Sequence, residues 1–124
     1  YIKESRYPVS KEDLFRKFPG ITDIVISLAI SDEPYIINLF GRYIHRRRLT
    51  LADTDIEYLR ETIERFLDDK KVCNCREIYD YINSDYPMLL MNNYIQCSFG
   101  LFSVLEYLFK QQYNFSRPYI AREM

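Results

Sequence analysis

The sequence predicts an α+β fold, mostly helical, in which one small unit of helices followed by a β-hairpin is used twice. The first observation is an internal repeat: residues 35–46 and 114–122 both carry Asn, Phe and Arg followed by Tyr-Ile-x-Arg. The second is that each copy follows an apolar, helix-like stretch, which itself follows a short amphipathic segment. We therefore expect an extended lead-in at residues 1–9, a first, shortened unit at residues 10–52 and a second unit at residues 53–124.

The first unit is predicted to hold two helices and two strands, over residues 11–18, 22–30, 35–40 and 42–49. Ser10 and Asp13 suit the start of the first helix, because a hydroxyl caps it and an acid favours its first turn. Pro19 and the glycine after it end this helix. Thr22 is the expected cap of the second helix, which is apolar nearly all round and is therefore expected to be buried. Gly41 marks the turn between two β-rich stretches.

The second unit is predicted to run helix, short strand, helix, helix and hairpin, over residues 55–69, 72–73, 75–82, 99–111 and 114–122. Thr54 and Glu57 have the spacing of a capping box at the start of the first helix, and Asn74 is expected to cap the second. Apolar residues recur at helical spacing along the first helix. Residues 88–97 are ambiguous, and we expect a loop followed by a short helix that begins near Asn92.

Three helices followed by a hairpin is the element order of a winged helix-turn-helix domain, and the chain resembles that superfamily. The residues that carry the likeness are 76–82, 101–109 and 115–120. The likeness covers residues 54–124 and is weaker over residues 10–49. It is loosely similar to compact modules appended to bacterial sigma-factor-like and restriction proteins. The resemblance implies a DNA-binding or protein-docking module, in which a helix enters the major groove and the hairpin, the wing, contacts backbone or minor groove.

The helix predicted in the recognition position departs from the pattern of DNA-binding helices. Its polar side chains expected at the surface are few: Ser98, Ser103, Glu106, Lys110 and Gln111. Among them Glu106 would repel phosphate. Direct reading of bases by this helix is therefore disfavoured, and contact between the wings and the DNA backbone is the better prediction.

The candidate nucleic-acid-binding residues are basic and polar side chains of the two wings. They are Arg42, His45, Arg46, Arg47 and Arg48 in the first wing, and Lys110, Asn114, Arg117 and Arg122 in the second. On a strand, Arg46 and Arg48 would share one face, with His45 and Arg47 on the other. Guanidinium groups match phosphate oxygens, so such a wing could follow a DNA backbone. The alternative is a solvated edge strand whose charges pair with the acidic helix that follows.

Composition and charge narrow the classes of protein to which the chain could belong. The formal net charge of −1 does not by itself mark a nucleic-acid binder. Cys73, Cys75 and Cys97 are odd in number and unsuited to a disulfide framework, so we expect a reduced, cytoplasmic setting. With His45 they would make a zinc site of poor spacing, and we predict no metal. No apolar run reaches the length of a membrane span, so no membrane association is expected.

Other clusters have ordinary structural explanations. The carboxylates of residues 53–69 are spread around a helix, which indicates a solvated or partner-docking face. Four tyrosines could stack on bases but are expected to complete the core: Tyr79, Tyr81, Tyr86 and Tyr94. There is no phosphate-cradling loop, nucleophile motif or Cys-His motif of recognisable spacing. We therefore predict neither an enzyme nor a cofactor.

These observations lead to a prediction of function. We expect the chain to bind double-stranded DNA through its Arg-bearing wings, in transcriptional or mobile-element control. The alternative is a protein-interaction module of a larger protein, which would use the acidic helix and the tyrosines. A homodimer is compatible with either function, because winged helices often pair to read two half-sites.

Overall fold

The computed structural model describes residues 2, 5, 7–22, 25–26 and 34–122 of the 124-residue chain. The chain divides into two compact units, Tyr1–Leu49 and Thr50–Met124. Each unit contributes one small antiparallel sheet, and helices make up most of the regular structure. The prediction of an α+β, mostly helical protein is therefore confirmed. Among the described residues, no helix is long and apolar enough to cross a membrane.

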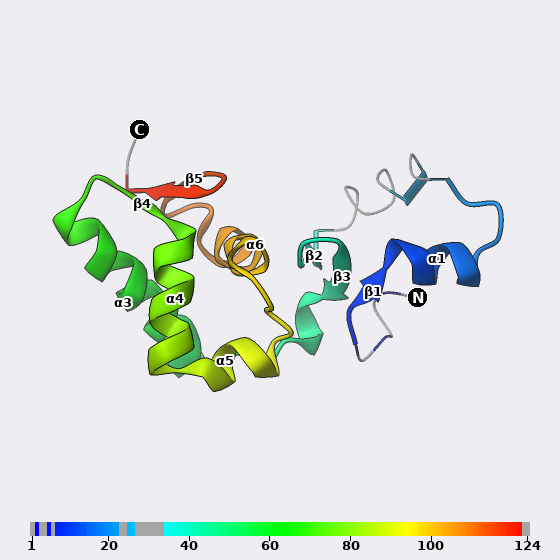
Figure 1. The fold of residues 1–124 in the computed structure, drawn as a ribbon, viewed down its shortest axis with the longest axis horizontal. Coiled ribbons are helices and arrows are strands. Elements are labelled where there is room, and N and C mark those ends of the chain that lie inside the picture. Colours follow the sequence, from blue (N-terminus) through cyan, green and yellow to red (C-terminus); the bar gives the residue numbers. More distant parts are fainter. Residues whose placement is uncertain (1, 3–4, 6, 23–24, 27–33, 123–124) are drawn as a thin grey trace. The chain divides into compact units, whose positions relative to one another are not determined.

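The first unit is a three-stranded sheet with one described helix (Figure 1). Its elements are β1 (Val9–Ser10), α1 (Lys11–Lys17), β2 (Ile36–Asn38), β3 (Arg42–His45) and a 3-10 turn, η1 (Arg46–Arg48). The strand order is β1-β3-β2, with β3 in the centre and both neighbours antiparallel to it. The unit has its own small core, formed by Ile2, Val9, Leu14, Ile26 and Tyr43.

The start of α1 follows the predicted capping box. The Ser10 hydroxyl accepts a hydrogen bond from the Asp13 N–H at 3.1 Å, and the Asp13 carboxylate accepts one from the Ser10 N–H at 3.1 Å. These two bonds satisfy N–H groups that a helix start otherwise leaves without partners. The Thr22 hydroxyl accepts from the Val25 N–H at 3.3 Å, as a helix cap does. Most of the helix predicted over residues 22–30 lies outside the described residues.

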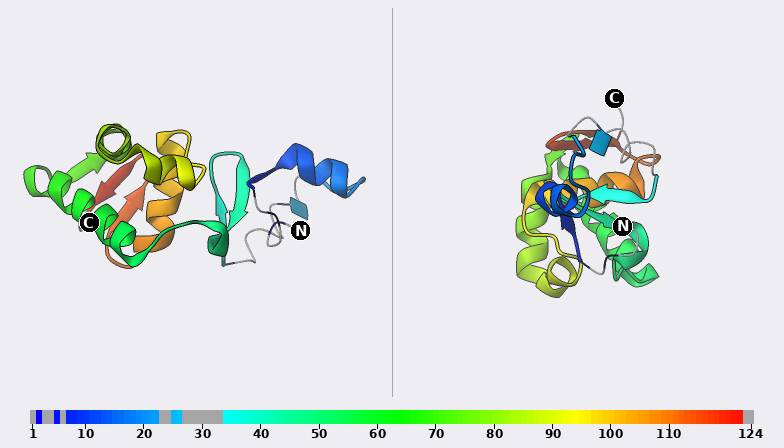
Figure 2. Two further views of the ribbon diagram at one scale, coloured as in Figure 1. Left: turned by 90° about the horizontal axis from the view of Figure 1, so that it is seen from below. Right: turned by 90° about the vertical axis from the view of Figure 1, so that its right-hand side faces the viewer.

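The second unit is larger and contains four helices and three strands. They are α3 (Asp53–Asp69), β4 (Val72–Asn74), α4 (Cys75–Asp85), α5 (Pro87–Asn92), α6 (Ser98–Phe109), β5 (Asn114–Ser116) and β6 (Tyr119–Ala121). The strand order is β4-β6-β5, all antiparallel, so the first strand of the unit pairs with the last (Figure 2). Each unit therefore places its last strand at the centre of its sheet.

The core of the second unit gathers around α6. Gly100, Leu101, Phe102, Val104, Leu105 and Phe109 of this helix are buried, which explains why its sequence is apolar nearly all round. Leu59 and Ile63 of α3 and Ile78 and Ile82 of α4 are fully buried. Their spacing of four residues places each pair on one helical face. The Asn74 side chain caps α4, as predicted, by accepting from the Arg76 N–H at 2.9 Å.

Three predicted boundaries in the second unit are wrong. Helix α4, predicted over residues 75–82, runs on to Asp85. Helix α3 begins at Asp53, two residues before the predicted start, because the Asp55 carboxylate accepts the Ala52 N–H at 3.1 Å. Thr54 therefore lies inside the helix and does not cap it. Pro87 begins α5, so the expected short helix ends at Asn92 instead of beginning there. Proline suits the first position of a helix, where its missing N–H has no partner to lose.

The strand predicted over residues 42–49 is wrong in its second half. Strand β3 ends at His45, and the chain then turns through η1. The His45 Nδ1 atom accepts the Arg47 N–H at 3.2 Å, and the Leu49 N–H donates to the Arg46 carbonyl at 3.1 Å. These local bonds replace the ladder of a longer strand. The alternation of faces expected for residues 45–48 therefore does not occur.

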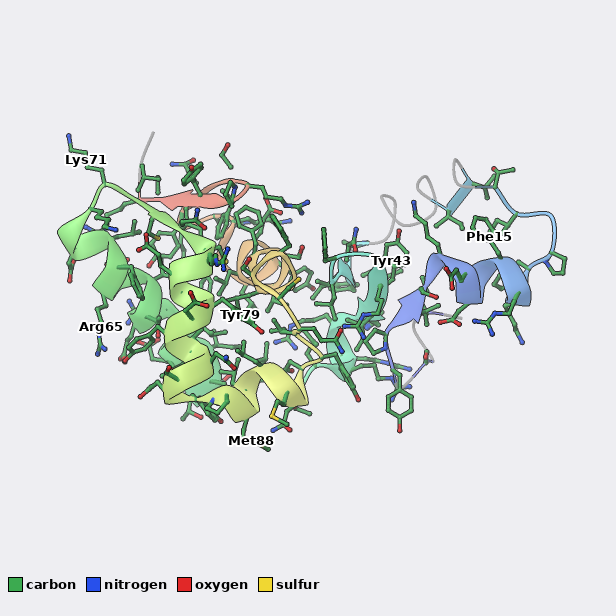
Figure 3. The ribbon with its side chains drawn as sticks, in the orientation of Figure 1. Phe15, Tyr43, Arg65, Lys71, Tyr79 and Met88 are labelled. Carbon is green, nitrogen blue, oxygen red and sulfur yellow. The ribbon has the colours of Figure 1, made fainter. Side chains whose placement is uncertain are left out.

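The two hairpins have the same strand connectivity but not the residue matching that the repeat suggests. The repeat in the sequence aligns Tyr43 with Tyr119. In the sheets, however, Tyr43 lies opposite Val9 and Ile120 lies opposite Cys73, and each of these partners directly precedes a helix cap. Tyr43 therefore corresponds in structure to Ile120, one residue beyond Tyr119. A shift of one residue moves a side chain to the other face of a sheet. Tyr43, labelled in Figure 3, is accordingly 5% exposed, and Tyr119 is 51% exposed.

Candidate nucleic-acid interface

The basic residues of the first unit lie on β3 and η1. Arg42, Arg46 and Arg48 are half-buried, and Arg47 is exposed. A 3-10 turn has about three residues per turn, so consecutive side chains of η1 project about 120° apart. The three consecutive arginines therefore diverge and do not line one face. Arg47 is the one whose position best suits contact with an external phosphate.

His45 has a structural position in this turn. It is buried, its Nδ1 atom accepts the Arg47 N–H, and its ring lies 5.8 Å from that of Tyr35. The main chain is fixed at the same place, because the Arg46 N–H donates to the Tyr35 carbonyl at 2.7 Å. An imidazole nitrogen that accepts a hydrogen bond carries no proton, so Nδ1 of His45 has none to donate to phosphate. His45 thus orients η1 and, through it, the start of the Arg47 side chain.

The turn of the first hairpin, residues 38–42, presents a residue that the sequence reading missed. Leu39 is buried, while the next residue, Phe40, is 59% exposed. The Phe40 φ of 62° and the Gly41 φ of 93° both lie in the left-handed region. The Asn38 side chain accepts the Gly41 N–H at 2.8 Å and the Leu39 N–H donates to the Arg42 carbonyl at 2.6 Å. The sequence signal for this exposed ring is an apolar residue directly before a turn glycine.

The second hairpin, residues 114–121, places Arg117 in its exposed turn. The Arg117–Pro118 peptide bond is cis. The Arg117 guanidinium lies over the ring of Phe102, 5.6 Å from its centre. Such cation–π contacts orient a guanidinium without consuming its hydrogen-bond donors. Asn114 on β5 and Lys110, just after α6, are also exposed.

Arg122 is engaged within the second unit. Its guanidinium lies 2.8 Å from a Glu64 carboxylate oxygen and 3.4 Å from one of Asp68, both on α3. The hydrogen bond to Asp68 and the charge of Glu64 raise the pKa of Arg122. The Tyr113 hydroxyl also donates to Glu64. This predicted site residue therefore braces the end of the second hairpin against the acidic helix α3.

Helix α6 offers little to a base edge. It contains no Lys or Arg, and the Ser103 hydroxyl donates to the Phe99 carbonyl at 3.3 Å. Glu106 is half-buried on the same helix. Of the polar residues expected at its surface, Lys110 and Gln111 are fully exposed, and both follow its last turn. Side chains that read bases must reach the groove in number, so this helix is poorly equipped for direct readout.

Charge is divided unequally between the two units. Residues 1–49 hold nine Lys and Arg against six Asp and Glu, a formal charge of +3, whereas residues 50–124 hold eight against twelve, a charge of −4. The net charge of −1 conceals this difference. Lys71, at the turn between α3 and β4, and Arg65 on α3 project outward from the acidic unit (Figure 3). Arg65 also donates to the Tyr81 hydroxyl. The first unit is therefore the more attractive surface for a polyanion.

The cysteines and tyrosines of the second unit serve its packing. Cys73 and Cys75 are buried, and burial raises the pKa of their thiols to about 11 and about 12. Both are therefore protonated at neutral pH, unlike metal-bound or reactive cysteines. In the part of the chain that the structure describes, no three His, Cys, Asp or Glu side chains are grouped as a metal ion requires. Tyr81 packs edge-on against Phe66, and Tyr86 edge-on against Tyr58.

The predicted site residues lie on both units, and the structure separates them into two sets. Arg47 and Arg117 are exposed guanidinium groups held by local contacts, whereas His45 and Arg122 have partners within their own units. Comparisons with protein-family models, with curated proteins and with solved structures find no match to this chain.

Proposed function

We propose that the chain is a DNA-binding module of the winged-helix type, which contacts the phosphate backbone of double-stranded DNA. The observation that carries the proposal is the arrangement of the second unit: a helix, a strand, three helices and a hairpin, with sheet order β4-β6-β5. Winged helices place three helices before a terminal hairpin and use both to approach DNA. This unit holds α5 in addition, between α4 and α6. The first unit has the same strand connectivity, which supports a tandem arrangement.

The expected mode of binding is dominated by phosphate contacts. Arg47 is exposed just after the first hairpin, and Arg117 is exposed in the turn of the second. Guanidinium groups at such positions can reach backbone oxygens. Helix α6 lacks the side chains for direct readout, so the module should discriminate weakly between sequences. Binding that depends on phosphates falls steeply with salt. A module with these properties suits transcriptional or mobile-element control, with sequence preference set by DNA shape or by a partner.

The experiment that tests the proposal removes the three consecutive arginines while keeping their aliphatic stems. The triple variant Arg46→Gln, Arg47→Gln, Arg48→Gln should bind a random-sequence duplex more weakly and with a shallower dependence on salt. Each lost phosphate contact should reduce the slope of log affinity against log salt by about 0.9. Arg47 is expected to account for most of this loss, because Arg46 and Arg48 are half-buried.

A matched control removes the same amount of charge from α3 and its end. The variant Arg60→Gln, Arg65→Gln, Lys70→Gln lowers the net charge equally but changes side chains that contact Glu57, Tyr81 and Glu77. It should bind DNA much as the parent chain does. Circular dichroism establishes that both triple variants are folded. Equal affinity and equal salt slope in the parent chain and the η1 variant would exclude the proposed surface.

A second function is favoured by one specific observation, the charge of −4 on residues 50–124. Exposed carboxylates of α3, such as Glu57 and Glu61, form a surface that suits a basic protein partner. In that case the second unit would dock a protein. A partner that binds the isolated chain, and that loses affinity when these two glutamates are replaced by Gln, would support this alternative.

A further inference from the structure

We propose that the outer face of the sheet β4-β6-β5 binds single-stranded nucleic acid, and that an unpaired base stacks on the ring of Tyr119. The inference goes beyond the proposed function and does not depend on it, because the bases of an intact duplex already stack on one another. Exposed aromatic side chains on a sheet are a common platform for unpaired bases, and they accept bases of any sequence.

The register of the strands determines which side chains share the outer face. Directly opposite residues, and residues two apart on one strand, point to the same face of a sheet. The face that includes Tyr119 therefore consists of six side chains from the three strands: Val72, Asn74, Asn114, Ser116, Tyr119 and Ala121. The residues between them, Cys73, Phe115 and Ile120, form the inner face.

The helices of the second unit pack against the inner face. Ile120 is fully buried there, and the Phe115 ring meets the Phe102 ring of α6 at a centroid distance of 5.5 Å. In Figure 1 these helices lie on one side of the sheet. On the outer face, by contrast, Tyr119 is 51% exposed and Val72 is 46% exposed. Both side chains can therefore meet a ligand without rearrangement of the core.

The neighbours of Tyr119 on the outer face suit a stacked base. Ala121, two residues along the same strand, is buried and presents only a methyl group, which cannot cover the ring. Val72 lies diagonally across from Tyr119 and adds apolar surface beside it. Asn74 and Ser116 lie directly opposite Tyr119. The Asn74 oxygen caps α4, so a base would receive hydrogen bonds from its amide N–H groups, and the exposed Ser116 hydroxyl can donate or accept.

The sheet is the positive part of an otherwise acidic unit. The strands and their flanking positions, residues 70–76 and 110–122, contain no Asp or Glu and six basic residues: Lys70, Lys71, Arg76, Lys110, Arg117 and Arg122. In the described part of the unit, every carboxylate side chain belongs to α3, α4 or α6. A polyanion is therefore attracted to the sheet and repelled by the helices.

Exposed basic residues stand at both ends of the outer face. Lys71 precedes β4 at one end. Arg76 follows β4 at the other end, where Arg117 lies in the turn before Tyr119. A single strand along the face would thus meet a positive group on each side of the stacked base, and such groups bind phosphates. Positive ends around an exposed ring favour a nucleic acid over an apolar protein surface.

The first test uses the absence of tryptophan from the sequence. The full-length variant Tyr119→Trp is titrated at low salt with single-stranded oligothymidylate or oligouridylate of about ten nucleotides. Its emission should be quenched, because the indole stacks on a base. The matched control is Met88→Trp on α5, a position of the same unit with the same exposure of 51%. Its emission should change little, and equal quenching at the two positions would overturn the proposal.

Two further variants measure the contribution of the ring to affinity. Tyr119→Ala should weaken binding to the preferred oligonucleotide about ten-fold, as expected for the loss of one stacked base. Tyr119→Phe keeps the ring and should bind within about two-fold of the parent chain. Circular dichroism checks that both variants are folded. The tighter of the two oligonucleotides identifies whether the face prefers DNA or RNA, whereas equal affinities of Tyr119→Ala and the parent chain would overturn the stacking.

The positive ends of the face are tested by the salt dependence. The double variant Lys71→Gln, Arg76→Gln should reduce the slope of log affinity against log salt by about 0.7 for each lost phosphate contact with a single strand. The control Arg60→Gln, Arg65→Gln removes the same charge from α3 and should keep the slope of the parent chain. Equal slopes in the two double variants would count against the proposed path of the strand.

A fully paired duplex separates this inference from the proposed function. Tyr119→Ala should bind the duplex as the parent chain does, because paired bases offer no free face to the ring. If the parent chain does not bind single strands at low salt, the inference is overturned whether or not it binds the duplex. If it binds single strands in a Tyr119-dependent way but not the duplex, the proposed function fails and the inference stands.

Discussion

Asn93 is a fully buried polar residue that stabilises the second unit. Its side-chain carbonyl accepts the Thr50 N–H at 2.7 Å, and its amide donates to the Leu89 carbonyl at 2.8 Å. It thereby fastens the start of the unit to the end of α5. Residues 88–97 were ambiguous in the sequence because this organisation depends on a partner more than forty positions away. Local propensity carries no information about such a contact.

We expect Asn93→Ala to lower the free energy of unfolding by about 2–3 kcal/mol, because buried polar groups lose their partner. Urea denaturation of the full chain measures this loss. The neighbouring exposed residue provides the control: Asn92→Ala should stay within about 0.5 kcal/mol of the parent. Equal stabilities of the two variants would contradict the structural account of Asn93.

Phe40, in the turn of the first hairpin, illustrates the same limit. The sequence identified Gly41 as a turn, but it did not distinguish Phe40 from the aromatic residues that fill the core. The difference between the two states depends on the φ of 62° and on the buried neighbour Leu39. The sequence identified Arg47 as a site residue. It did not show that the 3-10 turn η1 directs the side chain of Arg47 away from those of Arg46 and Arg48.

At the scale of elements, the signals that were confirmed are local ones. Ser10 and Asn74 cap their helices as predicted, and the hairpin at residues 114–122 forms where β-rich residues flank a turn. These depend on contacts within a few residues, which a sequence pattern records. The strand predicted over residues 42–49 is wrong beyond His45, because the His45 side chain caps a turn and the ladder ends there. A histidine cap competes with a strand only when the ring is held in place, as it is beside Tyr35.

The contacts between the second hairpin and α3 lead to a prediction about Arg117 and Arg122. Arg122→Ala should change DNA affinity little, because its guanidinium already pairs with Glu64 and Asp68. It should also cost less than about 1 kcal/mol of stability, since the pair is exposed. Arg117→Ala should instead reduce the salt slope by about 0.9, as the loss of one phosphate contact requires.

Filter binding or fluorescence anisotropy on one duplex across several salt concentrations compares these two variants. They remove the same charge from the same hairpin, so each serves as the control for the other. A larger loss of affinity in Arg122→Ala than in Arg117→Ala would show that the ion pairs with α3 open when DNA binds, against the present account.

At the scale of the whole molecule, three buried acidic groups link stability to pH. Burial, as the largest cause, raises the pKa of Cys73 to about 11, of Cys75 to about 12 and of Tyr113 to about 12. Their ordinary values are 9.0 for the thiols and 10.0 for the phenol. Above pH 9 the unfolded chain therefore releases protons that the folded chain retains.

The contribution of these groups to the free energy of unfolding should accordingly be constant below pH 9. It should fall as pH rises from 9 toward 12. Urea denaturation under reducing conditions at several alkaline pH values measures the fall. The double variant Cys73→Ala, Cys75→Ala should be less stable at neutral pH but lose less stability on raising the pH. A parallel fall in parent and variant would show that the thiols are not the linked groups.

The chain as a whole combines a positive unit with a negative one, which a net charge of −1 conceals. The exposed arginines of the hairpins, Arg47 and Arg117, are proposed to contact phosphates. The measurement that tests this proposal most directly is the affinity of the full chain for a random-sequence duplex across a salt series. We predict a slope of log affinity against log salt of about −2 or steeper, which corresponds to two or more neutralised phosphates. No binding at low salt, or a slope near zero, would contradict the account.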